Sequence, residues 1–211
     1  MAMKHKIEKI EILSPEEFKK AFKNKQLIKE AKENAKYEYG CIMARVDQQV
    51  QRPGLNVAHL YKPEDDRYGI ESEQHITLLY GLHADIPEID VVRFLMSLKM
   101  PTIALSGIGI FSNPEFDVVK YDVSAPILSC QNELATKLFP FTSNFPDYKP
   151  HLTISYMLPG TGAEYAKVFQ EPIQLPVTAW IYSQANGRKI EISDDGVFGS
   201  KVIVLREARN D

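Results

Sequence analysis

HITLLY, residues 75–80, returns later in the chain as HLTISY, residues 151–156, and this repeat decides the fold. Each copy is a His-x-Thr followed by apolar residues that suit an extended strand. Alternate side chains of a strand share a face, so we expect the His and the Thr of each copy to point the same way. An imidazole and a hydroxyl opposite an apolar face indicate a strand that borders a wet, functional cleft.

The same alternation predicts where the later residues of each copy point. Ser155 should share the face of its His and Thr. Tyr80 and Tyr156 should lie on the opposite, apolar face, as core aromatics of a strand usually do.

Composition limits the classes of protein that the chain can belong to. With 211 residues, 44% hydrophobic and 25% charged, it reads as an ordinary globular protein with a substantial core. The formal net charge of −3 argues against a wide footprint on duplex DNA or RNA, whereas a small phosphorylated ligand needs only a few local cations. No stretch approaches the length of a membrane span, and the charged N-terminus is unlike a secretory signal. We expect a cytoplasmic protein without a membrane partner.

The order of the elements predicts an α+β protein. An N-terminal extension, residues 1–38, is mainly helical, with a helix that starts at Ser14-Pro15. Residues 39–206 form a single domain. Its expected elements are a strand at 39–47, a long loop at 48–74, a helix at 86–99, a hairpin of 102–111 and 118–123, a helix at 126–138, a short helix within 160–170, a hairpin of 173–183 and 188–193, and a closing strand at 201–205.

Two imidazoles and two hydroxyls that face one pocket suit an in-line displacement at phosphorus. One His removes a proton from the attacking hydroxyl and the other protonates the departing oxygen, for which His75 and His151 are the candidates. Thr77 and Thr153 can donate hydrogen bonds to the non-bridging oxygens. This set supplies an acid, a base and an anion clamp, so we expect neither a metal nor a cofactor. A zinc site and a Ser-His-Asp hydrolase are weaker alternatives, because the chain has no His-Glu-x-x-His helix and no Gly-x-Ser-x-Gly elbow.

At these motifs the chain resembles the 2H phosphoesterase superfamily, which includes the bacterial LigT-like RNA ligase/cyclic phosphodiesterases. Residues 105–111 (LSGIGIF) are similar to the strand before the central hairpin of those proteins, and residues 149–154 (KPHLTI) to their second motif. The resemblance covers roughly residues 39–193. It implies a bilobal fold with two antiparallel sheets related by pseudo-twofold symmetry, helices on the outer faces and a central cleft.

The resemblance also implies metal-independent attack on 2′,5′- or 3′,5′-linked nucleotides, or on 2′,3′-cyclic phosphates. His75 and His151 match the acid and base positions, and Thr77 and Thr153 the phosphate clamp, without assigning which His is the base. Ser155-Tyr156 departs from the LigT-like branch, where a basic residue often follows the second motif. That departure argues against an RNA-ligase or tRNA-processing role.

Residues 69–81 also resemble bacteriophage members of the superfamily, some of which destroy cyclic oligonucleotide signals of host immunity. A nucleotide or short oligonucleotide is therefore the expected partner, in the host cytoplasm if the chain is viral. For base stacking and extra phosphate charge the sequence offers Tyr148, Trp180, Arg45 and Lys149. A non-catalytic nucleotide-binding module of the same fold, RNA-end processing, and a scaffold that binds a partner through the N-terminal helix stay open, as does the oligomeric state.

Overall fold

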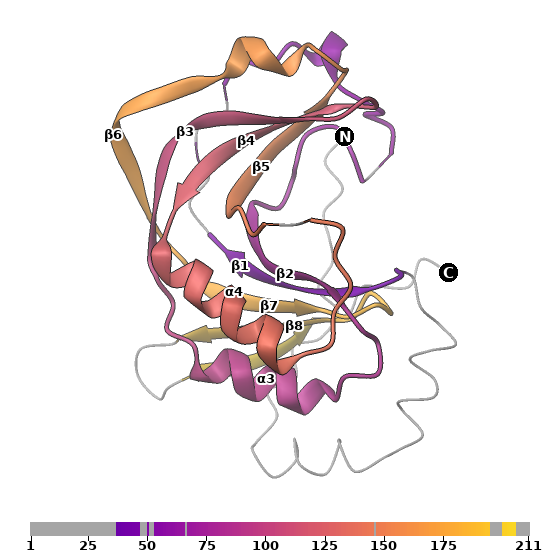
Figure 1. The fold of residues 1–211 in the computed structure, drawn as a ribbon, viewed down its shortest axis with the longest axis vertical. Coiled ribbons are helices and arrows are strands. Elements are labelled where there is room, and N and C mark those ends of the chain that lie inside the picture. Colours follow the sequence, from indigo (N-terminus) through magenta and orange to yellow (C-terminus); the bar gives the residue numbers. More distant parts are fainter. Residues whose placement is uncertain are drawn as a thin grey trace.

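The computed structural model describes residues 37–46, 50, 53–65, 67–145, 147–194 and 200–205. These residues form an α+β fold in which an antiparallel sheet carries two α-helices (Figure 1). The helix predicted from Ser14 onward lies outside the described residues, and so does all but the last two positions of the predicted extension. With 10 and 13 residues, the α-helices of the described part are too short to cross a bilayer, which needs about 20 apolar residues.

The strands of the described residues form a sheet of nine. Their bounds are β1 Gly40–Arg45, β2 His75–Leu82, β3 Thr102–Ser112, β4 Asp117–Ser124, β5 His151–Met157, β6 Lys167–Pro176, β7 Ala179–Ser183, β8 Lys189–Asp194 and β9 Ser200–Leu205. Their order across the sheet is β6-β3-β4-β5-β2-β1-β7-β8-β9, and every neighbouring pair is antiparallel.

A narrow junction divides this sheet. Between β2 and β5 the register holds a single pair, Ile76 with Leu152, whereas β4 and β5 share six pairs. Figure 1 shows β3, β4 and β5 in its upper half and β1, β2, β7 and β8 in its lower half. The two separate sheets and the pseudo-twofold symmetry that were expected are not confirmed, because the strands hydrogen-bond in one continuous order.

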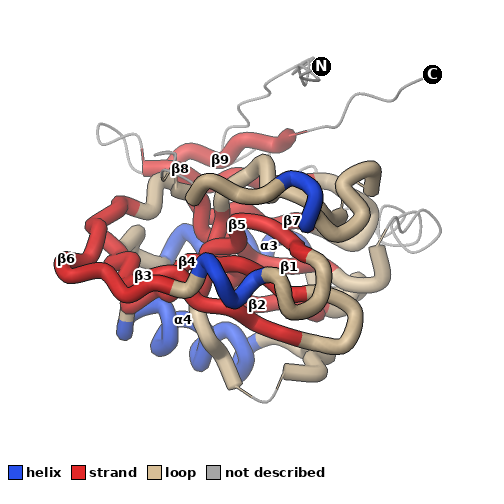
Figure 2. The backbone as a smooth tube through the Cα atoms, turned by 90° about the horizontal axis from the view of Figure 1, so that it is seen from above, coloured by secondary structure: helices blue, strands red, loops and turns tan. Residues whose placement is uncertain are grey.

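Two helices complete the core. Helix α3 spans Glu88–Ser97, and helix α4 spans Pro126–Leu138 and begins with proline, whose fixed φ suits the first helical turn. Leu95 of α3 and Leu128 of α4 are fully buried in the same core as Ile76 and Leu152. The helices therefore pack on the apolar face of the sheet, and Figure 2 shows α4 below the strands with β6 at the outer left.

The structure bears out most of the predicted elements and corrects two. The hairpins β3–β4 and β7–β8 lie where the turn residues predict them. The strand predicted at residues 173–183 is wrong, because Pro176 ends β6 and the chain then crosses from β3 to pair with β1 as β7. The helix expected within residues 160–170 is only a 3₁₀ turn, Gly162–Tyr165, after which β6 begins.

Candidate functional site

The two His-x-Thr motifs lie side by side at the junction of the sheet. His75 is the first residue of β2 and His151 the first residue of β5. The middle residues of the motifs, Ile76 and Leu152, pair with each other and are fully buried. Because this pairing is antiparallel, each His lies next to the Thr of the other motif on the opposite face. All four predicted catalytic side chains are half-buried and come together there.

Both histidines are held in the same way. The Nδ1–H of His75 donates to the backbone carbonyl of Glu73 over 2.8 Å, and the Nδ1–H of His151 donates to the carbonyl of Lys149 over 2.8 Å. A carbonyl oxygen can only accept, so the proton of each neutral ring resides on Nδ1. In each ring Nε2 is thus the nitrogen that gains or loses a proton.

Burial and the neighbouring charges favour the neutral form of His151. Burial lowers its pKa below the ordinary 6.5, and the hydrogen bond to the Lys149 carbonyl acts the other way. The positive charges of Lys120 and His75 lower this pKa further, whereas the carboxylate of Asp122 raises it. Near pH 7 the Nε2 of His151 is therefore ready to accept a proton.

The first motif is followed by a β-bulge. Met43 and Ile42 are consecutive on β1, yet they pair with Thr77 and Leu79 of β2. Leu78 is thus an extra residue without a counterpart, and the residues beyond it change face.

The second motif has a bulge at the matching position. Lys120 and Val119 are consecutive on β4, and they pair with Thr153 and Ser155 of β5. Ile154 is the extra residue here. Both bulges come directly after the Thr of a His-x-Thr, so the two strands share their irregularity as well as their letters.

The bulges overturn the faces that simple alternation predicts for the later residues. Ser155 lies on the apolar face and is fully buried, not beside the His of its motif. Tyr80 and Tyr156 return to the face of the His and Thr residues, where Tyr80 is 49% exposed and Tyr156 half-buried. The prediction that both tyrosines face away is wrong, because one extra residue between each Thr and the following Tyr shifts the period of two.

An ion pair between a buried lysine and a partly exposed aspartate, beside the second motif, was not predicted. Lys120 and Asp122 of β4 form a salt bridge and pair in register with Thr153 and His151. Phe111 of β3 contacts Lys120 and His151. The Lys120 Nζ lies 4.3 Å from the centre of the Phe111 ring, and the His151 ring lies edge-on to it, with 4.9 Å between the ring centres. Strand residues 117–124 (DVVKYDVS) hold the signal, since Lys120 and Asp122 alternate there with Val119, Tyr121 and Val123.

The first motif has an ion pair of its own. Arg45 of β1 pairs in register with His75, and its Nη1 lies 2.5 Å from the Oε2 of Glu191 on β8. Glu191 is buried. Of the residues predicted to bind substrate, Arg45 is thus brought next to a motif histidine.

The other predicted substrate-binding residues fall into three different places. Tyr148 is half-buried and donates from its hydroxyl to the backbone carbonyl of Thr77 over 3.2 Å, and burial raises the pKa of this hydroxyl. Lys149 is exposed beside His151. Trp180 is fully buried between Ala44 and Ile192 on the apolar face, so its prediction as a stacking platform is wrong.

Each motif strand is bound by the segment that leads into the other one. The segment before β2 donates from the Glu71 N–H to the carbonyl of the bulged Ile154, over 2.9 Å. The segment before β5 donates from the Thr142 N–H to the carbonyl of Gly81 in β2, also over 2.9 Å. Beside that, Asn132 of α4 donates to the carbonyl of the other bulged residue, Leu78, over 2.7 Å. The segment before β2 is thus hydrogen-bonded to β5, and the segment before β5 is hydrogen-bonded to β2.

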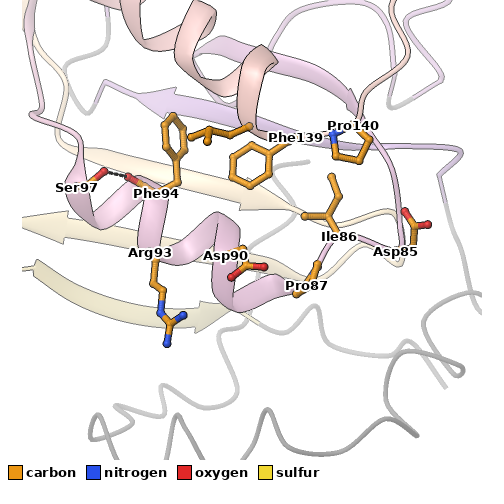
Figure 3. Close-up of a pocket in the computed structure, with 10 residues that line it drawn as sticks. Asp85, Ile86, Pro87, Asp90, Arg93, Phe94, Ser97, Phe139 and Pro140 are labelled. Carbon is orange, nitrogen blue, oxygen red and sulfur yellow. Dashed lines mark hydrogen bonds between the residues drawn. The ribbon is translucent and has the colours of Figure 1, made fainter.

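A surface hollow lies on the helical side, away from the motifs. It has a volume of about 660 Å³ and lies between α3, which contributes Phe94, and the end of α4, where Phe139 and Pro140 follow the helix (Figure 3). The central cleft expected between the motifs is not confirmed by this hollow. No set of three or more His, Cys, Asp or Glu among the described residues is arranged to hold a metal ion.

Comparison of the chain with protein-family models and with curated proteins gives no match.

Proposed function

We propose that the chain is a metal-independent phosphodiesterase of the 2H phosphoesterase type, which cleaves nucleotide phosphodiester bonds with His75 and His151 as acid and base. Thr77 and Thr153 hold the non-bridging phosphate oxygens. The observation that carries the proposal is the matched pair of Nδ1–carbonyl bonds, which leaves an Nε2 on each adjacent strand available for proton transfer.

The proton balance of the reaction fits this arrangement. One Nε2 takes the proton of the attacking hydroxyl, from water or from a ribose, as its oxygen bonds to phosphorus. The second His, protonated beforehand, gives its proton to the departing oxygen as that phosphorus–oxygen bond breaks. Exchange of one proton with water restores the starting state. Negative charge on the phosphoryl oxygens is held by hydroxyl donors, so the chemistry needs no metal.

The charges around the motifs favour a phosphodiester over a phosphomonoester. Lys120 is paired with Asp122, and Arg45 with Glu191, so each cation brings its own carboxylate. These two ion pairs add little net positive charge, which suits a singly charged diester better than a doubly charged monoester. A cyclic oligonucleotide, a 2′,5′-linked oligonucleotide and a 2′,3′-cyclic phosphate all carry singly charged diesters.

We extend the proposal to the finer fold and to the biological role. The matching bulges after Thr77 and Thr153, and the single pair at the junction, support two lobes related by a pseudo-twofold axis. The similarity of residues 69–81 to bacteriophage proteins supports an enzyme that degrades cyclic nucleotide signals of host immunity in the host cytoplasm.

Turnover of a small substrate panel in excess chelator tests the proposal. The panel holds 2′,3′-cyclic mononucleotides, a 2′,5′-linked oligoadenylate, and 3′,3′- and 2′,3′-cyclic dinucleotides. We expect chelator-resistant cleavage of at least one member, lost in both His75→Ala and His151→Ala. His83→Ala is the matched control, because His83 is half-buried like the motif histidines, bonds the Thr142 hydroxyl and belongs to no motif.

Each other outcome has a defined meaning. Cleavage that needs a metal, or that survives both motif changes, refutes the two-histidine mechanism. Tight nucleotide binding without cleavage, unchanged in the motif variants, points to a non-catalytic binding module instead. Cleavage of cyclic mononucleotide phosphates alone, with cyclic dinucleotides intact, refutes the role against immune signals but leaves the phosphodiesterase in place.

A further inference from the structure

Lys120 is an unusual residue for the interior of a strand. It is only 5% exposed, although lysine is almost never buried unless its charge is compensated. Two groups compensate it here: Asp122 forms a salt bridge with its ammonium, and the face of the Phe111 ring lies 4.3 Å from Nζ. Burial of a charge that needs this much support indicates a role beyond packing.

Gly109 leaves space for this ion pair. Gly109 of β3 pairs with Lys120, and a Cβ at Gly109 would lie 2.5 Å from the Asp122 carboxylate and 2.7 Å from the Lys120 Nζ. Any side chain at that position would displace the pair. The absence of a side chain on β3 thus lets both charged groups lie over that strand, beside the second motif.

The pair stands next to His151 in two independent ways. In register, Asp122 is opposite His151 and Lys120 is opposite Thr153. In space, the ammonium and the imidazole contact the same Phe111 ring, at 4.3 and 4.9 Å from its centre.

We propose that the Lys120–Asp122 pair, held beside His151 by the pairing of β4 with β5 and by the shared Phe111 ring, is a positioning element that sets the charge around this histidine for proton transfer. The inference rests on the proposed function, since it makes His151 the proton acceptor of the two motif histidines. Lys120 acts through His151 and is not required to contact substrate.

The groups that face His151 act in the directions this role needs. The ammonium of Lys120 and the charge of His75 lower the pKa of His151, and the carboxylate of Asp122 and the carbonyl of Lys149 raise it. Burial adds the largest effect and also lowers this pKa. Removal of Lys120 should therefore raise the pKa of His151, and removal of Asp122 should lower it.

The test is an NMR titration of His151 in the free full-length protein. Lys120→Met should raise its pKa, because the variant lacks the ammonium that lowers it and keeps the carboxylate that raises it. Asp122→Asn should lower it. Lys137→Met removes an exposed lysine that pairs with Glu133 on α4, and it should leave the titration unchanged. The acid limb of the pH–rate profile should shift in the same direction as the pKa of His151 in each variant.

A merely structural role of the ion pair would not shift the pKa of His151 in opposite directions in Lys120→Met and Asp122→Asn. If His151 titrates at the same pH in the native protein, Lys120→Met and Asp122→Asn, the inference is overturned. Should Lys120→Met fail to fold, Asp122→Asn decides alone, because this aspartate side chain is 49% exposed and its change is the milder one. If the titrations shift as expected but no substrate is cleaved, the proposed function fails while the control of His151 stands.

Discussion

Gly81→Ala should lower the free energy of unfolding far more than Gly160→Ala does. Both glycines have a positive φ, +89° at Gly81 and +79° at Gly160, a conformation that costs an alanine about 1–2 kcal/mol. At Gly160 nothing lies within 4 Å of the new Cβ, so that cost is the whole effect. At Gly81 the Cβ would lie 1.8 Å from the carbonyl oxygen of Thr142, which is backbone and cannot rotate away.

The segment before β5 must therefore move away from β2 in Gly81→Ala. That movement breaks the hydrogen bond from the Thr142 N–H to Gly81 and strains the one from the His83 N–H to Pro140. At about 1 kcal/mol for each bond, the total loss comes to roughly 3–4 kcal/mol, which is a large share of the 5–15 kcal/mol typical of a domain.

Urea denaturation of the native protein, Gly81→Ala and Gly160→Ala measures the difference. We expect the free energy of unfolding to fall about 2 kcal/mol further in Gly81→Ala than in Gly160→Ala. Equal losses in the two variants would refute the reasoning, since they would mean that the contact between β2 and residue 142 contributes nothing.

Three further results follow from contacts near the motifs. Tyr148→Phe removes the donor to the Thr77 carbonyl and should lower the free energy of unfolding by about 1 kcal/mol in urea, and an unchanged midpoint would contradict that bond. Asn132→Ala leaves the carbonyl of the bulged Leu78 without this donor and should cost about 1–3 kcal/mol, whereas wild-type stability would show that the bulge does not need it. The pKa of His151 is lowered in the folded state, so the unfolded chain binds its proton first as the pH falls. Stability should therefore decrease below about pH 6.5, less steeply in His151→Gln, and identical pH dependence in both proteins would contradict the shift.

The sequence predicted the motif strands and the face of their first three residues. Ile76 and Leu152 are buried and the His and Thr residues lie opposite, as a period of two requires. The prediction failed only beyond Leu78 and Ile154, which are buried as expected, because both are ordinary strand residues in letter and nothing local marks them as bulges. A bulge is decided by how neighbouring strands and loops pair, which is tertiary information.

Other parts of the candidate site were in the sequence but were not recognised. Lys120 and Asp122 alternate with the buried Val119 and Tyr121, a pattern that places two charges on one face of an interior strand. Trp180, by contrast, was predicted to stack on a substrate base but is fully buried. Its strand, β7, lies in the interior of the sheet between β1 and β8, so an aromatic ring there packs into the core.

The hydrogen bonds that join β2 and β5 to the segments before each other determine how the protein unfolds on heating. Two halves that meet at one backbone pair, Ile76 with Leu152, would by themselves be free to unfold one after the other. Here the segment before each strand is hydrogen-bonded to the strand of the other half, so neither half can loosen without releasing part of its neighbour. Heat should therefore unfold the protein in one cooperative transition, with equal calorimetric and van't Hoff enthalpies. Two histidines separated by 76 positions in the chain would then lose their alignment at a single temperature.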